Sequence, residues 1–453
     1  MKFRLVDYAL HPFAIKHRHD ALLESQYWAP ARRREWVQEH LERTLRHAVK
    51  NVPYYRRTLA PYESRFNDMI DRLDLSGLPA LSKQEVRVHF GELCADGISD
   101  VERNLVRTSG TTGTPTRFLM DQESNLNQFA SLWRVLNWAG YRFGNRFVDF
   151  KADPGRRFPA SYDARQNCIV FPLEHIKKEN VPLYVRAIRM FRPVLIKAYP
   201  QTLNLVCHWM EELGLDSLPA RRVICCAETL RDHHRATIEK VMQCPVYDFY
   251  AQNERAALIS TCEKGRYHVH EEYSFVESAG ERGDRSGPGK SVEVVTTTFH
   301  NLAMPLIRYQ TGDLVTLGDG APCECGRTYR TVGRIDGRLQ DMIVAPDGRY
   351  LGSLEHAFFD APGVQMSQIV QETTAGIEVK IVRAEDFVSE DLERVEARLR
   401  RMVGDEMDIE ISLVDSIPPG QNGKIPFIIS KPGSQAAQDD PAAAERPSVT
   451  GDS

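Results

Sequence analysis

Helical segments and short apolar segments of β type alternate along much of this chain. Residues 32–59, 125–140 and 181–191 carry apolar side chains at spacings of three and four, which predicts amphipathic helices. Residues 223–227 and 292–298 are short, apolar and contain β-branched side chains, which predicts buried strands. Helices that alternate with buried strands, without an internal repeat, indicate an α/β architecture with a largely parallel sheet.

The size and charge of the chain narrow the classes of protein to which it can belong. It has 453 residues, of which 42% are hydrophobic and 26% charged, enough for two or three domains with a large core. Its 58 basic and 62 acidic residues give a net charge of −4, so we do not expect nucleic acid as a main partner. Nine cysteines are an odd number spread over a long chain, which argues against a secreted disulfide scaffold.

The sequence has no run of 18 or more apolar residues, and its first residues do not follow the pattern of a signal peptide. We therefore expect a soluble, cytoplasmic protein that does not interact with a membrane.

A change of pattern after residue 330 predicts a domain boundary. Glycines occur at 333, 337 and 348, and the pattern of the sequence after them predicts a compact α+β unit. This unit is predicted to contain a helix near 354–359, strands near 367–371 and 377–382, a long helix over 389–403 and a strand over 408–414. The prediction is an N-terminal domain over 1–337, a small C-terminal domain over 338–431 and a disordered tail over 432–453, which is rich in Ala, Pro, Ser and Asp.

The segment 107–116, with the sequence RTSGTTGTPT, is the most specific local pattern in the chain and indicates a candidate phosphate-binding loop. Its two glycines let the backbone curl, and its hydroxyl side chains stand beside backbone N–H groups, which is suitable for holding a phosphate. A P-loop would end in Gly-Lys-Ser/Thr, whereas Gly113 is followed by Thr114 and Pro115. A surface loop rich in Ser, Thr and Gly is the alternative interpretation.

A second candidate site combines sulfur and imidazole ligands. Cys323 and Cys325 form a Cys-x-Cys pair, and Cys262 and His268 stand together further upstream. Three thiolates and one imidazole suit tetrahedral Zn²⁺, and a site filled by protein ligands is structural rather than catalytic. His270 could supply the imidazole in place of His268. If it does not, we expect it to be a solvent-facing strand residue on the same face as His268.

Several segments, in order, resemble the adenylate-forming superfamily of acyl-CoA synthetases, and within it the phenylacetate-CoA ligase and CapK-like branch. The resemblance extends over about residues 35–430 and rests on NVPYYR at 51–56, LPALSK at 78–83, SGTTGTPT at 109–116, CAET at 226–229, YAQNE at 250–254, RYQTGDL at 308–314, GRLQDMI at 337–343 and PGQNGK at 419–424. It implies a large N-terminal domain with mixed sheets and helices and a small, mobile α+β C-terminal domain.

The resemblance also implies site residues and cofactors. ATP would be held at its phosphates by Thr108, Ser109, Gly110, Thr111, Thr112 and Gly113, at its adenine by Ala227, Glu228 and Tyr250, and at its ribose by Asp313 and Arg338. Glu254 would bind Mg²⁺, and Lys424 would stabilise the adenylation transition state. Members of the branch with a similar Cys-x-Cys-Gly-Arg segment also have the upstream Cys and His, which supports structural Zn²⁺.

The implied activity is an ATP-dependent carboxylate ligase that forms an acyl-AMP and then a thioester, with coenzyme A as the expected thiol. The acid is expected to be aryl or similar, in a pocket lined by residues around 134–153, 199–202 and 225–251, and a homodimer is an open possibility. Two residues depart from the family pattern, because Ala251 replaces a glycine and Gln340 replaces the hinge aspartate. The alternatives are an amide ligase or adenylyltransferase in capsule polysaccharide or natural-product biosynthesis, and a nucleotide-binding module without turnover.

Overall fold

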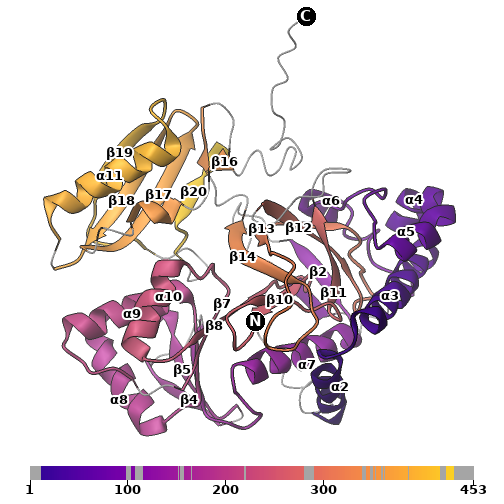
Figure 1. Ribbon diagram of the computed structural model, residues 1–453, viewed down its shortest axis with the longest axis horizontal. Coiled ribbons are helices and arrows are strands. Elements are labelled where there is room, and N and C mark those ends of the chain that lie inside the picture. The colour runs from indigo at the N-terminus through magenta and orange to yellow at the C-terminus, as the bar shows by residue number, and fades with distance from the viewer. Residues whose placement is uncertain are drawn as a thin grey trace, which may run out of the picture.

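The computed structural model describes residues 12–97, 104–107, 116–151, 153, 158–164, 166–218, 221–279, 290–338, 343–346, 350–351, 354–358, 361, 363–385, 387–418 and 425–432. Figure 1 shows the larger part of the molecule below and to the right, with the C-terminal elements as a separate unit at the upper left.

A 12-stranded sheet forms the framework of the larger part, in the order β11-β12-β13-β14-β10-β9-β8-β7-β6-β3-β5-β4. Its strands are β3 (Phe147–Lys151), β4 (Ser161–Asp163), β5 (Cys168–Pro172), β6 (Leu195–Ala198), β7 (Val223–Cys226), β8 (Val246–Ala251), β9 (Leu258–Thr261), β10 (Tyr267–Val269), β11 (Ser274–Ala279), β12 (Ser291–Thr298), β13 (Tyr309–Leu317) and β14 (Thr331–Arg338).

The sheet is mixed, which corrects the expectation of a largely parallel one. Strands β5, β3, β6, β7 and β8 are parallel, and the remaining neighbours are antiparallel. Helices α8 (Val181–Phe191), α9 (Pro200–Glu212) and α10 (Asp232–Met242) lie between β5, β6, β7 and β8 along the chain, whereas over the described ranges 258–279 and 290–338 the strands β9 to β14 follow one another without a helix. A short apolar run has the same appearance in either kind of sheet, so only the prediction of an α/β fold with mixed sheets and helices is confirmed.

Helices cover both faces of the parallel strands. Helices α8, α9 and α10 share one core with β3, β6 and β7. Helix α7 (Gln122–Trp138) packs on the other face, and its N-cap is Asp121, whose side chain accepts a 2.7 Å hydrogen bond from Ser124 N.

The N-terminal helices are α2 (Pro12–Ser25), α3 (Pro30–Asn51), α4 (Pro53–Thr58), α5 (Phe66–Arg72) and α6 (Lys83–Val88). Helices α3 to α6 share a core with residues of the antiparallel strands, whereas α2 packs on α7. Helix α3 ends before Pro53, because the residue before a proline avoids the helical conformation. A capping box between Ser82 and Glu85 starts α6, and Leu81 just before it bridges to Tyr309 of β13.

The C-terminal unit has its own sheet and its own core. The strand order is β19 (Asp408–Leu413), β18 (Gly376–Arg383), β17 (Val364–Thr373) and β20 (Ile428–Ser430), and α11 (Ser389–Val403) packs on it. Helix α11 has the predicted bounds, and the short 3₁₀ helix over Leu354–Phe358 lies where a helix was predicted.

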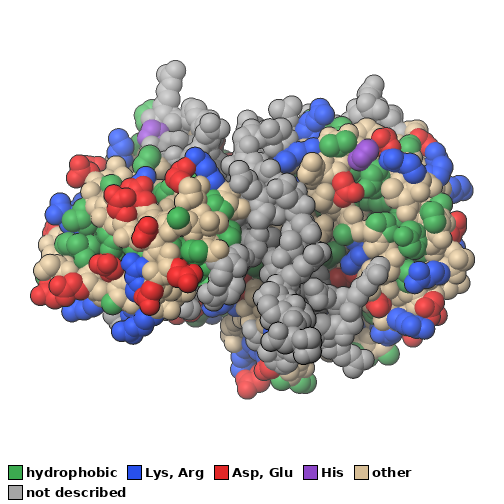
Figure 2. Space-filling view, turned by 90° about the horizontal axis from the view of Figure 1, so that it is seen from above, with side chains coloured by type: hydrophobic (Ala, Val, Ile, Leu, Met, Phe, Trp, Pro, Cys, Tyr) green, Lys and Arg blue, Asp and Glu red, His purple; other side chains and the backbone are tan. Residues whose placement is uncertain are grey.

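The surface is consistent with the near-neutral net charge. On the face seen in Figure 2, basic and acidic side chains of the described residues are interspersed. No helix in the described ranges has the length and apolarity that crossing a bilayer requires.

Candidate functional site

The end of β8 brings two of the predicted nucleotide ligands together. The hydroxyl of Tyr250 donates a 2.6 Å hydrogen bond to Oδ2 of Asp313 on β13, and Gln252 Nε2 lies 3.4 Å from the same oxygen. Asp313 is buried, and its backbone N–H donates to Thr311 Oγ1 at 3.1 Å. The structure therefore holds the Tyr250 and Asp313 side chains in one orientation before any ligand binds.

Glu254 lies beside this pair and is buried, unlike an ordinary surface glutamate. Its Oε1 accepts a 3.2 Å hydrogen bond from the Tyr309 hydroxyl, and among the described residues Oε2 accepts none. The next residue, Arg255, has a φ of 58°, a left-handed conformation that side chains rarely adopt. Such strain is typical of functional sites and is consistent with a constrained loop at Glu254.

The loop after β7 and the last residues of β14 lie close together. Ala227 is exposed and has a φ of 69°, and a Cβ added to Gly337 would stand 3.1 Å from Thr229 Oγ1. Asp313 pairs with Arg338 in the register of β13 and β14. The backbones at Ala227, Glu228, Asp313 and Arg338 are thus gathered around one place, although the side chain of Arg338 is outside the description.

The predicted phosphate loop, from Thr108 through Ser109, Gly110, Thr111 and Thr112 to Gly113, lies outside the described residues. Its flanks form an antiparallel hairpin of β1 (Asn104–Arg107) and β2 (Arg117–Met120). The Phe118 ring of β2 is 6.0 Å from the ring of Tyr309, and Arg87 Nε donates a 2.9 Å hydrogen bond to Thr116 Oγ1. The hairpin is therefore anchored next to the residue that contacts Glu254.

Lys424 also lies outside the described residues, as do Gln340 and Asp341. The segment after Lys424 is described, and there the guanidinium of Arg231 lies 4.4 Å from the centre of the Phe427 ring. Arg231 directly follows the loop with Ala227 and Glu228. The chain that follows Lys424 thus contacts the larger part next to the loop with Ala227 and Glu228.

Two side chains near the site were not assigned a role from the sequence. Glu293 of β12 accepts a 2.9 Å hydrogen bond from Gly312 N, and Lys83 Nζ donates at 2.9 Å to the carbonyl of Thr311. Burial raises the pKa of Glu293 to about 7, and the charge of Asp313 adds to this increase. Lys83 is part of the LPALSK segment, so its motif was visible, whereas Glu293 follows no motif.

The predicted metal ligands Cys262, His268, Cys323 and Cys325 meet in one cluster, with all ligand atoms within 4.8 Å of one another. The sulfurs of Cys262 and Cys323 are 3.7 Å apart, and Cys325 Sγ is 3.5 Å from His268 Nε2. A tetrahedral Zn²⁺ with Zn–S bonds of about 2.3 Å holds its sulfur ligands about 3.8 Å apart, so these residues fit that ion. The cluster joins the β9–β10 turn to the segment before β14.

His270 does not belong to this cluster, which removes the alternative ligand. It is buried rather than exposed to solvent, and its ring nitrogens contact Ser260 Oγ at 2.7 Å and an Arg134 nitrogen at 2.6 Å. The sequence pattern placed His270 on a strand face but could not indicate that α7 covers it.

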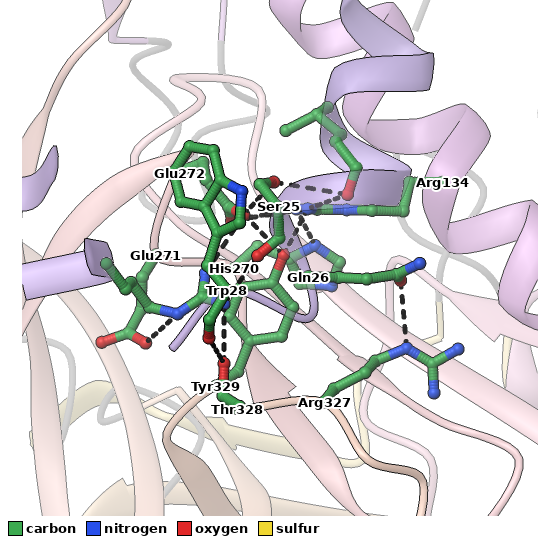
Figure 3. Close-up of polar contacts among 12 residues, drawn as sticks. Ser25, Gln26, Trp28, Arg134, His270, Glu271, Glu272, Arg327, Thr328 and Tyr329 are labelled. Atoms are coloured by element: carbon green, nitrogen blue, oxygen red, sulfur yellow. Dashed lines mark hydrogen bonds and ion pairs between the residues drawn. The ribbon is translucent and has the colours of Figure 1, made fainter. Parts of the chain in front are cut away.

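A buried polar network surrounds His270 (Figure 3). Glu272 accepts a 2.7 Å hydrogen bond from the Tyr329 hydroxyl and pairs with Arg33 at 3.1 Å and with Arg134 at 3.4 Å. Gln26, just after α2, accepts a 3.1 Å hydrogen bond from Nε of Arg327, two residues after Cys325. The sequence did not indicate this network, because its members are far apart along the chain.

Comparisons with known proteins agree with this geometry. The family model of the CapK C-terminal domain matches residues 343–431. A phenylacetate-coenzyme A ligase of Pseudomonas putida is 29% identical over 321 residues, which are 68% of this chain and 70% of that protein. Protein CapK of Staphylococcus aureus is 23% identical over 388 residues, 81% of this chain and 84% of that one. In fold, the chain resembles the crystal structure of a 2-hydroxyisobutyryl-CoA ligase in the postadenylation state, with a TM-score of 0.68, 18% identity and coverage of 91% of this chain and 94% of that chain.

Proposed function

Because the chain belongs to the phenylacetate-CoA ligase and CapK-like branch of the adenylate-forming enzymes, we propose that it ligates a carboxylic acid to a thiol in two steps. In the first step the carboxylate attacks the α-phosphate of ATP, which gives an acyl-AMP and releases pyrophosphate. In the second step the thiolate of coenzyme A attacks the acyl carbon, which gives the thioester and releases AMP.

One observation carries this proposal, namely the junction of Tyr250, Asp313 and Glu254 beside the hairpin that bears the phosphate loop. The Asp313 carboxylate can accept hydrogen bonds from ribose hydroxyls, and Tyr250, held at 2.6 Å from it, offers a ring face to adenine. Both groups are fixed by the protein, so they need little reorganisation when ATP binds.

Glu254 is the proposed ligand of Mg²⁺, since its Oε2 is not engaged by a described residue and hard oxygen ligands suit this ion. Bound Mg²⁺ neutralises charge on the phosphates. Thr108, Ser109, Gly110, Thr111, Thr112 and Gly113 are proposed to surround the phosphates with N–H and hydroxyl donors, and Arg338 to contact the ribose next to Asp313. Lys424 is proposed to offset the charge that develops on the transferring α-phosphate.

We also propose that residues 1–337 and 338–431 are separate domains and that the smaller one moves relative to the larger between the two steps. Support comes from the separate cores of the two parts and from the polar contacts between them. Of the tail predicted over 432–453, residues 433–453 lie outside the described residues. We place the protein in the cytoplasm, where ATP and coenzyme A are available and thiols stay reduced.

The test is acid-dependent exchange of labelled pyrophosphate into ATP. We expect Lys424→Ala to slow this exchange by about 10²–10³, the usual cost of losing one group that stabilises transition-state charge. Lys431→Ala is the matched control, because Lys431 is an exposed lysine of the same unit that pairs with Glu372. Exchange at the normal rate in Lys424→Ala would contradict the role of Lys424.

The same assay separates the remaining functions. Pyrophosphate exchange that depends on an acid, followed by a thioester only when coenzyme A is added, supports the ligase. Product formation with an amine or a sugar instead of coenzyme A identifies an amide ligase or adenylyltransferase. ATP binding without exchange for any acid identifies a nucleotide-binding module.

We propose in addition that Cys262, His268, Cys323 and Cys325 bind a structural Zn²⁺. We expect about one zinc per chain by elemental analysis and loss of the metal in Cys323→Ser, with a Tm lower by about 2–4 °C for each kcal/mol of lost stability. Cys94→Ser is the control, because Cys94 lies on the N-terminal side and outside the cluster. Metal content that is the same in both variants would contradict the site.

A further inference from the structure

A charged cluster stands at the carboxyl ends of the parallel strands, and neither Lys197 nor the charge of Asp149 has a role in the function proposed above. Lys197 Nζ of β6 lies 3.3 Å from both carboxylate oxygens of Asp149 on β3. Lys151, the last residue of β3, lies 3.8 Å from the same carboxylate. Two lysines thus share one aspartate, and this group of three side chains carries an excess positive charge.

The pair occupies the point where the sheet topology reverses. The chain passes from β3 to β5 on one side and then to β6 on the other side, so β3 and β6 are neighbours in the order β7-β6-β3-β5. Asp149 and Lys197 are direct partners in the register of these two strands. In open α/β sheets, ligands bind at the carboxyl ends of the strands at such a reversal.

The pair faces the side of the sheet that α7 covers. Phe147 and Leu195 pack there in a core cluster with Val135 of α7. Asp149 and Lys197 stand two residues further along the same strands, so they project to the same side beyond this cluster. The Lys197 side chain is 27% exposed although β6 lies between two other strands, so packing does not seal this side chain completely.

The pair is also close to the proposed nucleotide site. Tyr199 and Cys226 lie near enough to influence the pKa of Lys197, and Cys226 directly precedes Ala227. Burial alone lowers the pKa of Lys197, but Asp149 outweighs this effect, so the pKa is raised and the ammonium stays charged. Two strand spacings, about 10 Å, separate β6 from β8, whose Phe249 and Ala251 lie on the same side of the sheet as Lys197, and a small acid can bridge this distance.

We propose that Lys197 and Asp149 form the polar end of the acid-binding site and select acids with a second oxygen-bearing group, a phenol, hydroxyl or carboxylate, remote from the reacting carboxylate. This inference rests on the proposed function. An oxygen substituent would accept a hydrogen bond from Lys197 or, where it carries a proton, donate one to Asp149. An unsubstituted acid would place an apolar group against this charged pair, whose donors and acceptors would then bond only to each other.

Such a site discriminates strongly for a physical reason. A pocket built to hydrogen-bond a substrate hydroxyl rejects the analogue without it by as much as about 10⁴, because buried polar groups then remain unpaired. A purely apolar pocket distinguishes the same pair by about 10² or less. The preference for one of two matched acids therefore reports whether Lys197 and Asp149 contact the substrate.

The experiment compares matched acids in the pyrophosphate exchange assay: phenylacetate with 4-hydroxyphenylacetate, benzoate with 4-hydroxybenzoate, and hexanoate with adipate. We expect wild-type kcat/KM to favour the oxygenated member of at least one pair by tenfold or more, about 1.4 kcal/mol. The double variant Lys197→Met, Asp149→Leu removes both charges, and we expect it to reduce this preference at least tenfold while apolar acids still react. Lys197→Arg keeps the positive charge and should still favour the oxygenated acid. It therefore tests the inference even if the double variant does not fold.

The control is Lys240→Met, which removes a surface lysine paired with Glu211 and should leave the preference unchanged. An equal preference in wild type and double variant, or a wild-type preference for the unsubstituted acids, would overturn the inference. If no acid supports exchange, the proposed function fails, and calorimetric titration with the same acids decides the inference. Tighter binding of the oxygenated acids that disappears in the double variant would then support it, and equal binding would refute it.

Discussion

Glu293 makes the environment of Asp313 sensitive to pH. Burial raises its pKa to about 7, against about 4.3 in an unfolded chain, so between these values the folded protein holds a proton that the unfolded chain has lost. The stabilisation is complete below about pH 4 and is lost as the pH rises through about 7. We expect Glu293→Gln to remove this part of the pH dependence, at most about 1.4 kcal/mol per pH unit.

The measurement is the free energy of unfolding from urea titrations at pH 5 and pH 8. Wild type should lose more stability than Glu293→Gln over this interval. Glu378→Gln is the control, since Glu378 is a partly exposed acid of the C-terminal sheet that pairs with Lys380. The same pH dependence in wild type and Glu293→Gln would rule out the assigned titration.

Single residues of the site differ in how far the sequence could predict them. Tyr250, Glu254 and Asp313 could be selected as candidates because each lies in a short motif, and the order of the motifs is specific. Glu293, which lies near them, could not be selected, since it pairs with the backbone N–H of Gly312, a contact that no local pattern marks. His270 shows the opposite error, because a period of two gives the face of a strand but not what covers that face.

At the scale of elements, one buried carboxylate connects four segments of the chain. Glu272 contacts Ser25 at the end of α2, Arg33 on α3, Arg134 on α7 and Tyr329 before β14. Burial raises the pKa of Glu272, but the two arginines outweigh this and lower it, so the group is charged at neutral pH. We expect Glu272→Gln to cost about 3–5 kcal/mol, because it removes the carboxylate that both buried arginines share and leaves Arg33 only a longer pair of 3.7 Å with Glu271.

Urea unfolding of Glu272→Gln at pH 7 measures this cost. Glu42→Gln applies the same substitution to a surface pair with Arg46, and its effect should stay within about 0.5 kcal/mol. Equal midpoints for the two variants would show that the network contributes little to stability.

The elements themselves follow local and non-local rules to different degrees. Helix α11 has its predicted bounds, because the spacing of Val395, Leu399 and Val403 gives one apolar face that packs within its own small core. The direction of neighbouring strands was predicted only in part, since pairing is decided by the connections between them. The four metal ligands were predicted as a group because Cys and His are rare enough for their spacing to be informative, whereas the arginines and glutamates of the Glu272 network are not.

At the scale of the whole molecule, polar contacts join the C-terminal unit to the helices of the larger part. Lys178 Nζ lies 2.7 Å from Glu212 at the end of α9 and 3.1 Å from Glu385 of the C-terminal unit. Gln365 Nε2 also lies 3.4 Å from Glu212. Exposed pairs of this kind stabilise weakly, so they can hold one arrangement of the two parts without preventing another.

This arrangement brings Phe427, and with it the chain after Lys424, against Arg231, so weakening it should reduce the first step of the proposed reaction. Lys178→Glu replaces the bridging cation by a third carboxylate. We expect acid-dependent pyrophosphate exchange to fall by about twofold to fivefold, and small-angle scattering to give a larger radius of gyration. The double variant Lys178→Glu, Glu385→Lys restores one opposite-charge pair and should recover both values. Lys240→Glu changes a lysine on α10 that pairs with Glu211 and has no part in these contacts. If this control variant alters pyrophosphate exchange and the radius of gyration as much as Lys178→Glu does, the contacts at Lys178 do not hold the two parts together.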